Sequence, residues 1–179
     1  MIIKVRENLE LRLRATEEAE ETIAVINSNR EYLRQWLPWV DHTHTTEDIV
    51  KVIKKWQDDF NAKTDIVLGV YLDNKYVGNM GLHRINKDHN SAMIGYWIAS
   101  EYQGRGIMTD CVRTLTSYGF NEHGLNRIYI LCAVGNKKSR AIPERLGYKL
   151  EGILQDAVCL YGVYHDEAVY GMVKRNWGQ

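Results

Sequence analysis

The 179-residue sequence contains few of the residues that mark secreted, metal-binding or multidomain proteins. Its three cysteines, Cys111, Cys132 and Cys159, lie far apart, so no C-x-x-C pair of the kind that binds zinc is present. An odd number of cysteines without a secretion signal favours reduced thiols in a cytoplasmic protein. The chain has two prolines and no proline-rich linker. We therefore expect one continuous domain over residues 1–179, without a metal.

Long apolar runs and an excess of charge of either sign are also missing. The 23 Lys and Arg residues equal the 23 Asp and Glu residues, so the formal net charge is zero. Without a basic stripe, general nucleic-acid binding is disfavoured. No stretch approaches the ~20 apolar residues of a membrane-spanning helix, and the N-terminus lacks the apolar core of a secretion signal. We expect neither a nucleic-acid partner nor a membrane partner.

What is present is a globular composition, with 45% hydrophobic and 26% charged residues, whose periodicity changes along the chain. Leu11 and Leu13 alternate with arginines, which predicts a first strand. Three signals then predict helices. Acidic residues favour the first turn of a helix, a helix ends before the residue that precedes proline, and apolar residues spaced by three or four form one helical face. These helices are expected after Thr16, over residues 31–36 and over residues 49–60.

The middle and the end of the chain are richer in β-forming residues. Asp73 and Asn74 separate two such runs and predict a two-residue hairpin turn, and Gly147 suits the left-handed position that ends a helix. Strands are expected over residues 66–72, 75–82, 91–98, 127–134, 148–154, 157–161 and 165–173, and helices from residue 107 and over residues 137–146. This order predicts an α+β domain with a mixed sheet.

The segment from Gln103 to Met108 follows a predicted strand and leads into a predicted helix. The first N–H groups of a helix have no partner within the helix, and the helix dipole adds partial positive charge, so such a turn attracts a phosphate. Gly104 and Gly106 let the backbone approach an anion closely, and Arg105 adds a charge-assisted contact. The segment is neither a P-loop nor a dinucleotide-binding turn. By itself it is equally well a tight strand-to-helix turn.

A second set of residues lies at the order and spacing that a known family requires. These are an Asn-x-x-Ser helix start, a Glu-Arg-Leu-Gly-Tyr helix end and a Glu-Gly strand, at residues 136–139, 144–148 and 151–152. Together with the turn from Gln103 to Met108, they resemble the GNAT superfamily, the general N-acetyltransferases. Met108 departs from the family's usual alanine or glycine. The resemblance implies a mixed, mostly antiparallel central sheet flanked by helices, and acetyl-CoA as the cosubstrate.

Within the superfamily, the chain is similar to the RimJ/RimL type of ribosomal-protein N-acetyltransferases. Three more stretches support this likeness, namely residues 32–39, residues 94–98 and the terminal hairpin with His165 and Asp166. The likeness covers nearly the whole chain. It implies that a substrate amine, in this type the N-terminal α-amine of a protein, attacks the acetyl thioester directly. The family's habits also imply a homo-oligomer.

The resemblance assigns roles to individual residues. The backbone of Trp97 and its two successors would pair with the pantetheine arm, and the pyrophosphate would lie over the glycine turn. Asn136 and Ser139 are the expected catalytic residues, with Ser139 donating a hydrogen bond to the departing thiolate. Helix capping alone accounts equally for both residues. The residues expected to bind acetyl-CoA are Trp97, Ile98, Ala99, Gln103, Gly104, Arg105, Gly106, Ile107, Met108, Asn136 and Ser139.

The sequence offers no clear general base. The carboxylate that the family sometimes has after its Glu-Gly strand is absent, because Val158 aligns there. Asp41 and Glu101 are substitutes that act through water, although a solvated surface carboxylate is the simpler interpretation of each. A terminal α-amine, with a pKa of ~8, needs a base less than a lysine amine with a pKa of ~10.4. Pro143 removes the helical bond to the Ser139 carbonyl, which predicts a free carbonyl.

Trp36 and Trp39 flank Pro38 in an aromatic loop and are the expected substrate-binding residues. Packing or an oligomer contact explains the same loop equally well. Two other functions stay open, namely acetyl transfer to a small amine such as a polyamine, amino acid or antibiotic, and a non-catalytic acetyl-CoA-binding module. An acidic groove favours a cationic small molecule, and an open groove favours a peptide. No histidine belongs to a complete metal-ligand set.

Overall fold

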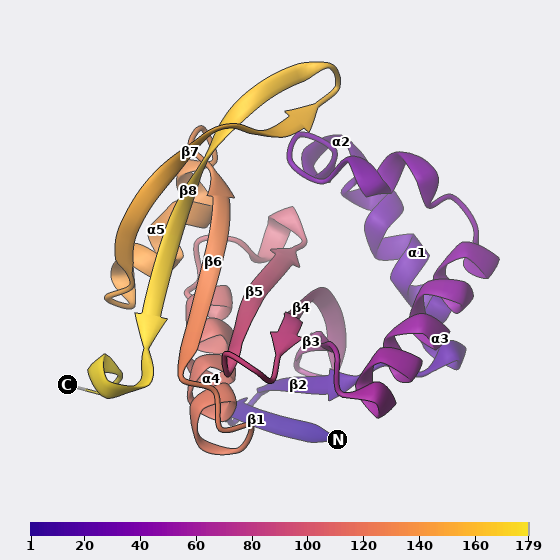
Figure 1. Ribbon diagram of the computed structural model, residues 1–179. Coiled ribbons are helices and arrows are strands. Elements are labelled where there is room, and N and C mark those ends of the chain that lie inside the picture. Colours follow the sequence, from indigo (N-terminus) through magenta and orange to yellow (C-terminus); the bar gives the residue numbers. More distant parts are fainter. Residues whose placement is uncertain (179) are drawn as a thin grey trace.

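The computed structural model describes residues 1–178, which fold around one eight-stranded sheet (Figure 1). The strands are β1 (Ile2–Arg6), β2 (Leu9–Leu13), β3 (Ile66–Leu72), β4 (Lys75–Asn86), β5 (Ser91–Ile98), β6 (Arg127–Ala133), β7 (Lys149–Leu160) and β8 (Val163–Val173). Their order across the sheet is β1-β2-β3-β4-β5-β6-β8-β7, and only β5 and β6 are parallel within the described residues. The predicted α+β class with a mixed, mostly antiparallel sheet is confirmed.

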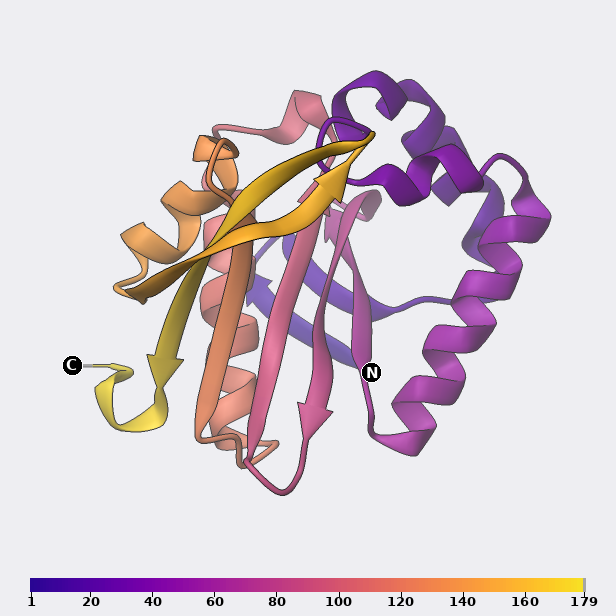
Figure 2. The ribbon, with the colours of Figure 1, turned by 45° about the horizontal axis from the view of Figure 1, so that its top comes forward.

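Helices cover both faces of this sheet (Figure 2). The α-helices are α1 (Ala19–Ser28), α2 (Arg30–Leu33), α3 (Thr46–Ala62), α4 (Ile107–Asn121) and α5 (Lys137–Arg145), and a 3-10 helix spans Pro38–His42. The first three α-helices lie on one face, and α4 and α5 lie on the other (Figures 1 and 2). The larger buried cluster fills the space between the sheet and α4, and a second cluster joins α1 and α3.

Helix α3 begins where the sequence supplies a reciprocal cap. The Asp48 N–H donates to the Thr45 hydroxyl at 3.1 Å, and the Thr45 N–H donates to the Asp48 carboxylate at 3.0 Å. Ile49 and Ile53 lie on the predicted apolar face and are buried against α1. Each such side chain contributes ~1.5–3 kcal/mol when it leaves water. The amphipathic helix predicted over residues 49–60 is thereby confirmed.

The predicted hairpin turn and the predicted left-handed helix end are both present. Asp73 and Asn74 have φ angles of 50° and 62° and join β3 to β4 in a two-residue turn, which matches the right-handed twist of a hairpin. Gly147 has a φ of 77° directly after α5. The lengths of β3, β4 and α5 therefore follow from local chemistry.

The terminal strands and the second helix differ from the prediction. Two strands over 148–154 and 157–161 were expected, but β7 is one strand that bulges between Leu154 and Val158. The bulge survives because the Asp156 N–H donates to the Asp166 carboxylate on β8 at 3.0 Å. Strand β1, which pairs with β2, was not predicted. Helix α2 ends at Leu33 rather than Trp36, since its last turn tightens before Pro38.

The parallel pair β5 and β6 opens along its length. Its register is limited to Ser91 with Arg127, Ala92 with Ile128 and Met93 with Tyr129. Beyond Met93 the two strands run on to Ile98 and Ala133 without pairing, and β5 keeps only its bonds to β4. A splayed pair exposes unpaired backbone N–H and C=O groups on both facing edges. This opening lies at the centre of the molecule, between the two helix layers.

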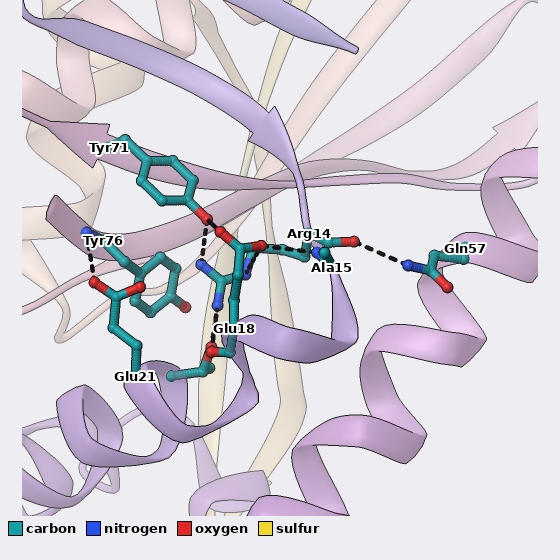
Figure 3. A network of polar contacts seen from close by, with 8 residues as sticks. Arg14, Ala15, Glu18, Glu21, Gln57, Tyr71 and Tyr76 are labelled. Carbon is teal, nitrogen blue, oxygen red and sulfur yellow. Dashed lines mark hydrogen bonds and ion pairs between the residues drawn. The ribbon is translucent and has the colours of Figure 1, made fainter. Parts of the chain in front are cut away.

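At the opposite side of the sheet, a buried arginine ties β2, β3 and α1 together (Figure 3). Arg14 donates to the Tyr71 hydroxyl at 2.6 Å and to the Glu18 carbonyl at 3.0 Å, and it also bonds the Thr22 hydroxyl. Its guanidinium lies 3.9 Å from the centre of the Tyr76 ring. Only 3% of Arg14 is exposed. Because a buried cation needs partners on every side, this network fixes how α1 sits on the sheet.

Candidate active site

A cavity of about 1080 Å³ lies where β5 and β6 separate. Its walls come from the unpaired ends of those two strands, from the start of α4, from α5, from α2 and from the β7–β8 hairpin. The cavity therefore passes through the sheet and meets both helix layers. The tip of the hairpin reaches over toward α2, as both ribbon views show (Figures 1 and 2).

The glycine turn forms one end of this cavity. Gly104 and Gly106 have φ angles of 71° and 74°, in the left-handed region that favours glycine, and a Cβ at either position would meet nothing within 4 Å. Gly106 is the N-cap of α4, and within its first turn the Asp110 N–H is the one that bonds back, to the Gly106 carbonyl at 3.0 Å. The N–H groups of the preceding helical residues have no backbone partner among the described residues. This end of the cavity suits an anion.

Polar side chains surround the glycine turn. Lys138 Nζ donates to the Gln103 side chain at 3.0 Å, and Gln103 in turn bonds the Tyr32 hydroxyl on α2. Arg145 from the end of α5 donates to Thr109 at 3.1 Å. Lysine and arginine at the N-terminus of a helix add to its positive potential. The structure thus brings α2, α4 and α5 together around one anion-binding surface.

The β5 strand presents a free backbone edge to the cavity beside this turn. Trp97 and Ile98 line the cavity, and β4 occupies the other edge of the strand. Ala99 does not line it, because Ala99 is fully buried and its N–H donates to the Val77 carbonyl at 2.8 Å. Trp97 precedes Ala99 by two residues, so its backbone also faces β4. An extended chain placed between β5 and β6 would therefore find its backbone partner at Ile98 rather than at Trp97 or Ala99.

Asn136 and Ser139 meet at the start of α5. The Asn136 side chain accepts a hydrogen bond from the Ser139 N–H at 3.2 Å, so Asn136 caps the helix. The Ser139 hydroxyl lies 3.2 Å from the Tyr96 hydroxyl and 3.2 Å from the Cys132 sulfur. Burial raises the pKa of both Tyr96 and Cys132, so both stay protonated near neutral pH. Four polar groups from β5, β6 and α5 thus converge on the cavity.

The Ser139 carbonyl is not free, contrary to the sequence prediction. Pro143 has no N–H to bond it, but the Tyr96 hydroxyl from β5 donates to this carbonyl at 2.9 Å. Tyr96 therefore holds the Ser139 backbone and also lies within hydrogen-bond distance of the Ser139 hydroxyl. A buried carbonyl without a donor costs ~1–3 kcal/mol, which this contact avoids.

The far side of the cavity is aromatic. Trp36 lines it from the segment after α2. Trp39 does not line it, because its ring packs 6.2 Å from the Trp97 ring and is 38% exposed. The Arg34 guanidinium lies 4.8 Å from the Tyr161 ring and so joins this segment to the tip of the β7–β8 hairpin. The two segments frame a mouth that is suited to apolar and aromatic contacts.

Neither carboxylate considered as a base lines the cavity. Asp41 forms a bidentate ion pair with Arg34 at 3.1 and 2.8 Å, and these hydrogen bonds lower the pKa of Asp41. A carboxylate in this state is a poor proton acceptor. Glu101 is exposed beside Ser100. His83 also lies outside the lining and bonds Asp65 at 3.0 Å.

Most of the predicted site residues meet in this one cavity. Those that line it are Trp36, Trp97, Ile98, Gln103, Gly104, Gly106, Ile107, Met108, Asn136 and Ser139. Arg105 does not, since its guanidinium lies 5.4 Å from the Tyr102 ring. Met108 is 6% exposed and its side chain packs in the core, so it leaves the surface above the turn clear.

Comparisons with known proteins identify the family. A model described as the acetyltransferase (GNAT) domain matches residues 9–149. The chain belongs to the GNAT acetyltransferase family. This N-acetyltransferase is 36% identical to YdaF of Bacillus subtilis (strain 168), named as a candidate ribosomal N-acetyltransferase, over 97% of this chain and 96% of that protein. It is 29% identical to a spermidine N(1)-acetyltransferase of Vibrio cholerae, over 89% of this chain and 90% of the other.

A solved structure is similar over nearly the same length. RimL, the ribosomal L7/L12 α-N-protein acetyltransferase, was solved in complex with coenzyme A, which is joined to a cysteine by a disulfide. It is 26% identical, covers 97% of this chain and 98% of its own, and superposes with a TM-score of 0.93. The predicted resemblance to this family is confirmed, and the cosubstrate of the acetyltransferase is acetyl-CoA.

The cavity of the acetyltransferase fits this cosubstrate. Its glycine turn suits a pyrophosphate, the free edge of β5 suits the amides of a pantetheine arm, and the cavity passes through the sheet. Acetyl-CoA supplies an activated acetyl thioester. An enzyme that holds such a group in a fixed orientation speeds the attack on it. No cluster of metal-binding side chains, and no helix able to cross a membrane, occurs among residues 1–178.

Several residues at the site were not predicted from the sequence. Tyr96 and Cys132 lie beside Ser139, Lys138 and Arg145 lie beside the glycine turn, and Glu167 lines the cavity from β8. Lys138 and Arg145 could have been predicted from the sequence, because both lie within the helix motif that carries the family resemblance. Tyr96, Cys132 and Glu167 belong to strands whose sequence pattern predicts only the alternation of core residues.

Tyr96 should act as a positioning residue for Ser139. In a Tyr96→Phe variant we expect the turnover number to fall about tenfold, the same loss as in Ser139→Ala, because both remove part of one hydrogen-bonded unit. The Michaelis constant for acetyl-CoA should change less than about twofold. The double variant should lose hardly more than either single variant. Steady-state thiol release measures all three enzymes, and independent, multiplicative losses would contradict this coupling.

Proposed function

We propose that this N-acetyltransferase acetylates the N-terminal α-amine of a protein. The supporting observation is the charge of the cavity. Within the described residues two carboxylates line it, Asp110 and Glu167, and Asp110 accepts hydrogen bonds from Arg6 and Arg113 at 2.8 Å each. One carboxylate is left for the acceptor. A peptide N-terminus brings one ammonium group, whereas a polyamine brings several, so the cavity is matched to a peptide.

The mouth of the cavity also favours a peptide. It lies between Trp36 on one segment and Val158 and Leu160 on the β7–β8 hairpin, so its walls are aromatic and aliphatic. The first residues of a peptide could extend from the reacting amine across these walls. The names of YdaF and RimL, which refer to ribosomal proteins, agree with such an acceptor.

Within this proposal, the glycine turn carries the pyrophosphate. Gly104, Gly106 and the first N–H groups of α4 face it, and Gln103, Ile107 and Met108 shape the turn. Ile98 pairs with the pantetheine arm through its backbone, and Trp97 lines the cavity beside it on the same strand. Ser139 donates a hydrogen bond to the departing thiolate, and Asn136 orients Ser139 by capping α5. In this arrangement Arg105 and Ala99 influence the shape of the loop and do not contact acetyl-CoA.

A panel of acceptors tests the proposal. Thiol release from acetyl-CoA would be measured with peptides that carry a free N-terminal serine or alanine, with the same peptides acetylated in advance, and with spermidine. We expect kcat/KM for the free peptides to exceed that for spermidine at least tenfold, and no release with the blocked peptides. A preference for spermidine would support the small-amine alternative. Binding of acetyl-CoA without release to any amine would instead indicate a non-catalytic module.

We propose in addition that residues 1–179 form a single cytoplasmic domain that assembles as a homodimer. The outermost strand β7 has a free edge, and five large apolar side chains on β7 and β8 are exposed. These are Leu150, Ile153, Leu154, Val163 and Tyr164. Light scattering should give about twice the 20.8 kDa mass of one chain. Leu154→Lys should shift the protein to the monomer mass, and a wild-type monomer would contradict this assembly.

A further inference from the structure

We propose that Glu167 is the catalytic base of this acetyltransferase, the group that receives the proton of the acceptor amine. The proposal rests on the acetyltransferase activity and holds for a peptide or a small amine alike. Strand β8 places Glu167 beside Ala133 on β6 and Leu154 on β7. The Glu167 side chain is half-buried and lines the cavity.

The position of Glu167 puts it on the acceptor side of the sheet. Directly opposed residues of paired strands share a face, so Glu167 lies on the same face as Ala133. Ser139 packs against the other face, where Cys132 alternates with Ala133 along β6. The thioester would lie in the gap between β5 and β6. Glu167 and Ser139 therefore approach that gap from opposite sides, one toward the amine and the other toward the sulfur.

Glu167 is also the one cavity carboxylate without a partner among the described residues. No hydrogen bond or ion pair engages it, whereas Asp110 is held by two arginines and Asp41 by Arg34. A half-buried carboxylate that forms no ion pair is available to attract an incoming ammonium group. Val158, across the hairpin on β7, cannot supply this charge. Glu167 on the neighbouring strand β8 thus supplies the carboxylate that is absent at Val158.

The other ionisable groups around Glu167 do not compete for its role. Burial, and to a smaller extent the charge of Glu167, raises the pKa of the Cys132 thiol on β6, and the charge of Arg140 on α5 acts in the opposite direction. On β8 itself, His165 lies two residues away, and Asp166 is engaged by the Asp156 N–H. The remaining titratable side chains that line the cavity are Tyr32, Tyr96, Tyr102, Asp110, Arg113, Lys138 and Arg145. Asp110 is the one carboxylate among them, and two arginines hold it.

The proton balance of the reaction defines what Glu167 does. The acceptor enters as an ammonium ion, and Glu167 takes one proton from it, directly or through a water molecule. The neutral amine then attacks the acetyl carbon, a C–N bond forms and the C–S bond breaks. The second nitrogen proton leaves as the amide forms, and the departing thiolate takes up one proton. One proton is released to solvent for each thiol, so the sum is balanced.

A Glu167→Gln variant tests this role through its pH profile. Without the carboxylate, the enzyme must collect the neutral amine from solution, and for an α-amine of pKa ~8 that fraction is about 1% at pH 6 and 10% at pH 7. We expect kcat/KM to fall about 100-fold at pH 6 and about tenfold at pH 7, and to come within about twofold of wild type at pH 9. A structural role would lower the rate equally at every pH.

Two further measurements keep the test decisive. The acetyl-CoA dissociation constant of Glu167→Gln should stay within about twofold of wild type, which shows that the cavity is intact. Glu167→Asp should keep the flat wild-type pH profile at a lower rate, because it retains a carboxylate. Glu101→Gln, an exposed carboxylate outside the cavity, serves as the matched control and should change nothing. A pH-independent loss in Glu167→Gln, or a full rate at pH 6, would overturn the proposal.

The test is separate from the identity of the acceptor. Whichever amine the wild-type enzyme acetylates serves as the substrate for the pH profile. If spermidine is the better acceptor, the peptide proposal fails, yet the deficit of Glu167→Gln should still grow as the pH falls. If the peptide is the better acceptor and the deficit is constant with pH, Glu167 is not the base while the acceptor proposal stands.

Discussion

Replacing Gly106 with leucine should raise the Michaelis constant for acetyl-CoA by two orders of magnitude or more while the protein stays folded. The backbone of Gly106 has a φ of 74°, and a Cβ there would meet no protein atom within 4 Å. The new side chain would therefore stand in the open space above the first turn of α4. That space is where a pyrophosphate must approach the free N–H groups. The loss comes from exclusion of the anion rather than from a clash within the protein.

The strain at Gly106 needs its own control, because leucine in the left-handed region costs ~1–2 kcal/mol. Gly124, after α4, offers a close match. Its φ is 64°, and a Cβ there also meets nothing within 4 Å. Gly124→Leu should lose a similar amount of stability and keep the wild-type Michaelis constant. Thermal melting and steady-state thiol release would be measured on both variants.

The two glycine variants separate binding from folding. Equal melting temperatures with a large difference in the acetyl-CoA Michaelis constant would support the anion site at the glycine turn. If Gly106→Leu binds acetyl-CoA as well as Gly124→Leu does, the pyrophosphate does not lie over this turn. A direct measurement of acetyl-CoA affinity by calorimetry would then decide whether binding or a later step had changed.

The parts of the fold that the sequence predicted well are those with local causes. Asp73 and Asn74 specify a hairpin turn through their own tolerance of positive φ, and Gly147 ends α5 in the same way. Helix α3 was predicted from the spacing of its apolar residues, and its reciprocal cap at Thr45 and Asp48, seen only in the structure, is equally local. Asn136 caps α5 as predicted. In each case the deciding atoms are within four residues of one another, so a short stretch of sequence contains the whole interaction.

The parts that it predicted poorly depend on contacts between distant segments. β7 is one strand because Asp166, ten residues away on β8, accepts a hydrogen bond at its bulge. The Ser139 carbonyl is satisfied by Tyr96 from β5. Glu167 becomes a cavity residue because β6 separates from β5 and leaves room beside Ala133. Local periodicity carries no information on which strands will part, so these features follow from the sheet alone.

The predictions of site residues also succeeded where the cause was local and failed where it depended on neighbours in space. The glycine turn and the start of α5 were predicted because a family pattern fixes their spacing, and both line the cavity. Arg105 was expected to contact the anion, yet its guanidinium lies by Tyr102. The direction of a long side chain depends on its neighbours in space, so spacing along the chain places the backbone of Arg105 and leaves its charge undetermined.

Replacing Arg14 with alanine should lower the free energy of unfolding by about 3–5 kcal/mol, the largest stability loss expected from a single polar side chain here. Arg14 is bonded to Tyr71, to the Glu18 carbonyl and to Thr22, and lies over Tyr76 (Figure 3). Its removal leaves the Tyr71 and Thr22 hydroxyls without a donor, while the Glu18 carbonyl keeps its bond from Thr22 at 2.8 Å. Since 1 kcal/mol shifts the melting temperature by ~2–4 °C in a domain of this size, the melting temperature should fall by roughly 6–20 °C.

The size of this loss follows from how closely the sheet is built around the guanidinium. A Cβ on Gly69 would lie 2.7 Å from the Arg14 side chain, so β3 keeps a glycine where the arginine passes. Lysine cannot replace it, because one ammonium group cannot reach Tyr71, Thr22 and the Glu18 carbonyl together. Arg14→Lys should therefore lose most of the same stability in urea denaturation. Arg12→Ala, on β2 two residues before Arg14 and partly solvent-accessible, should lose less than about 1 kcal/mol. Equal losses at the two arginines would mean that the buried network contributes nothing beyond its charge.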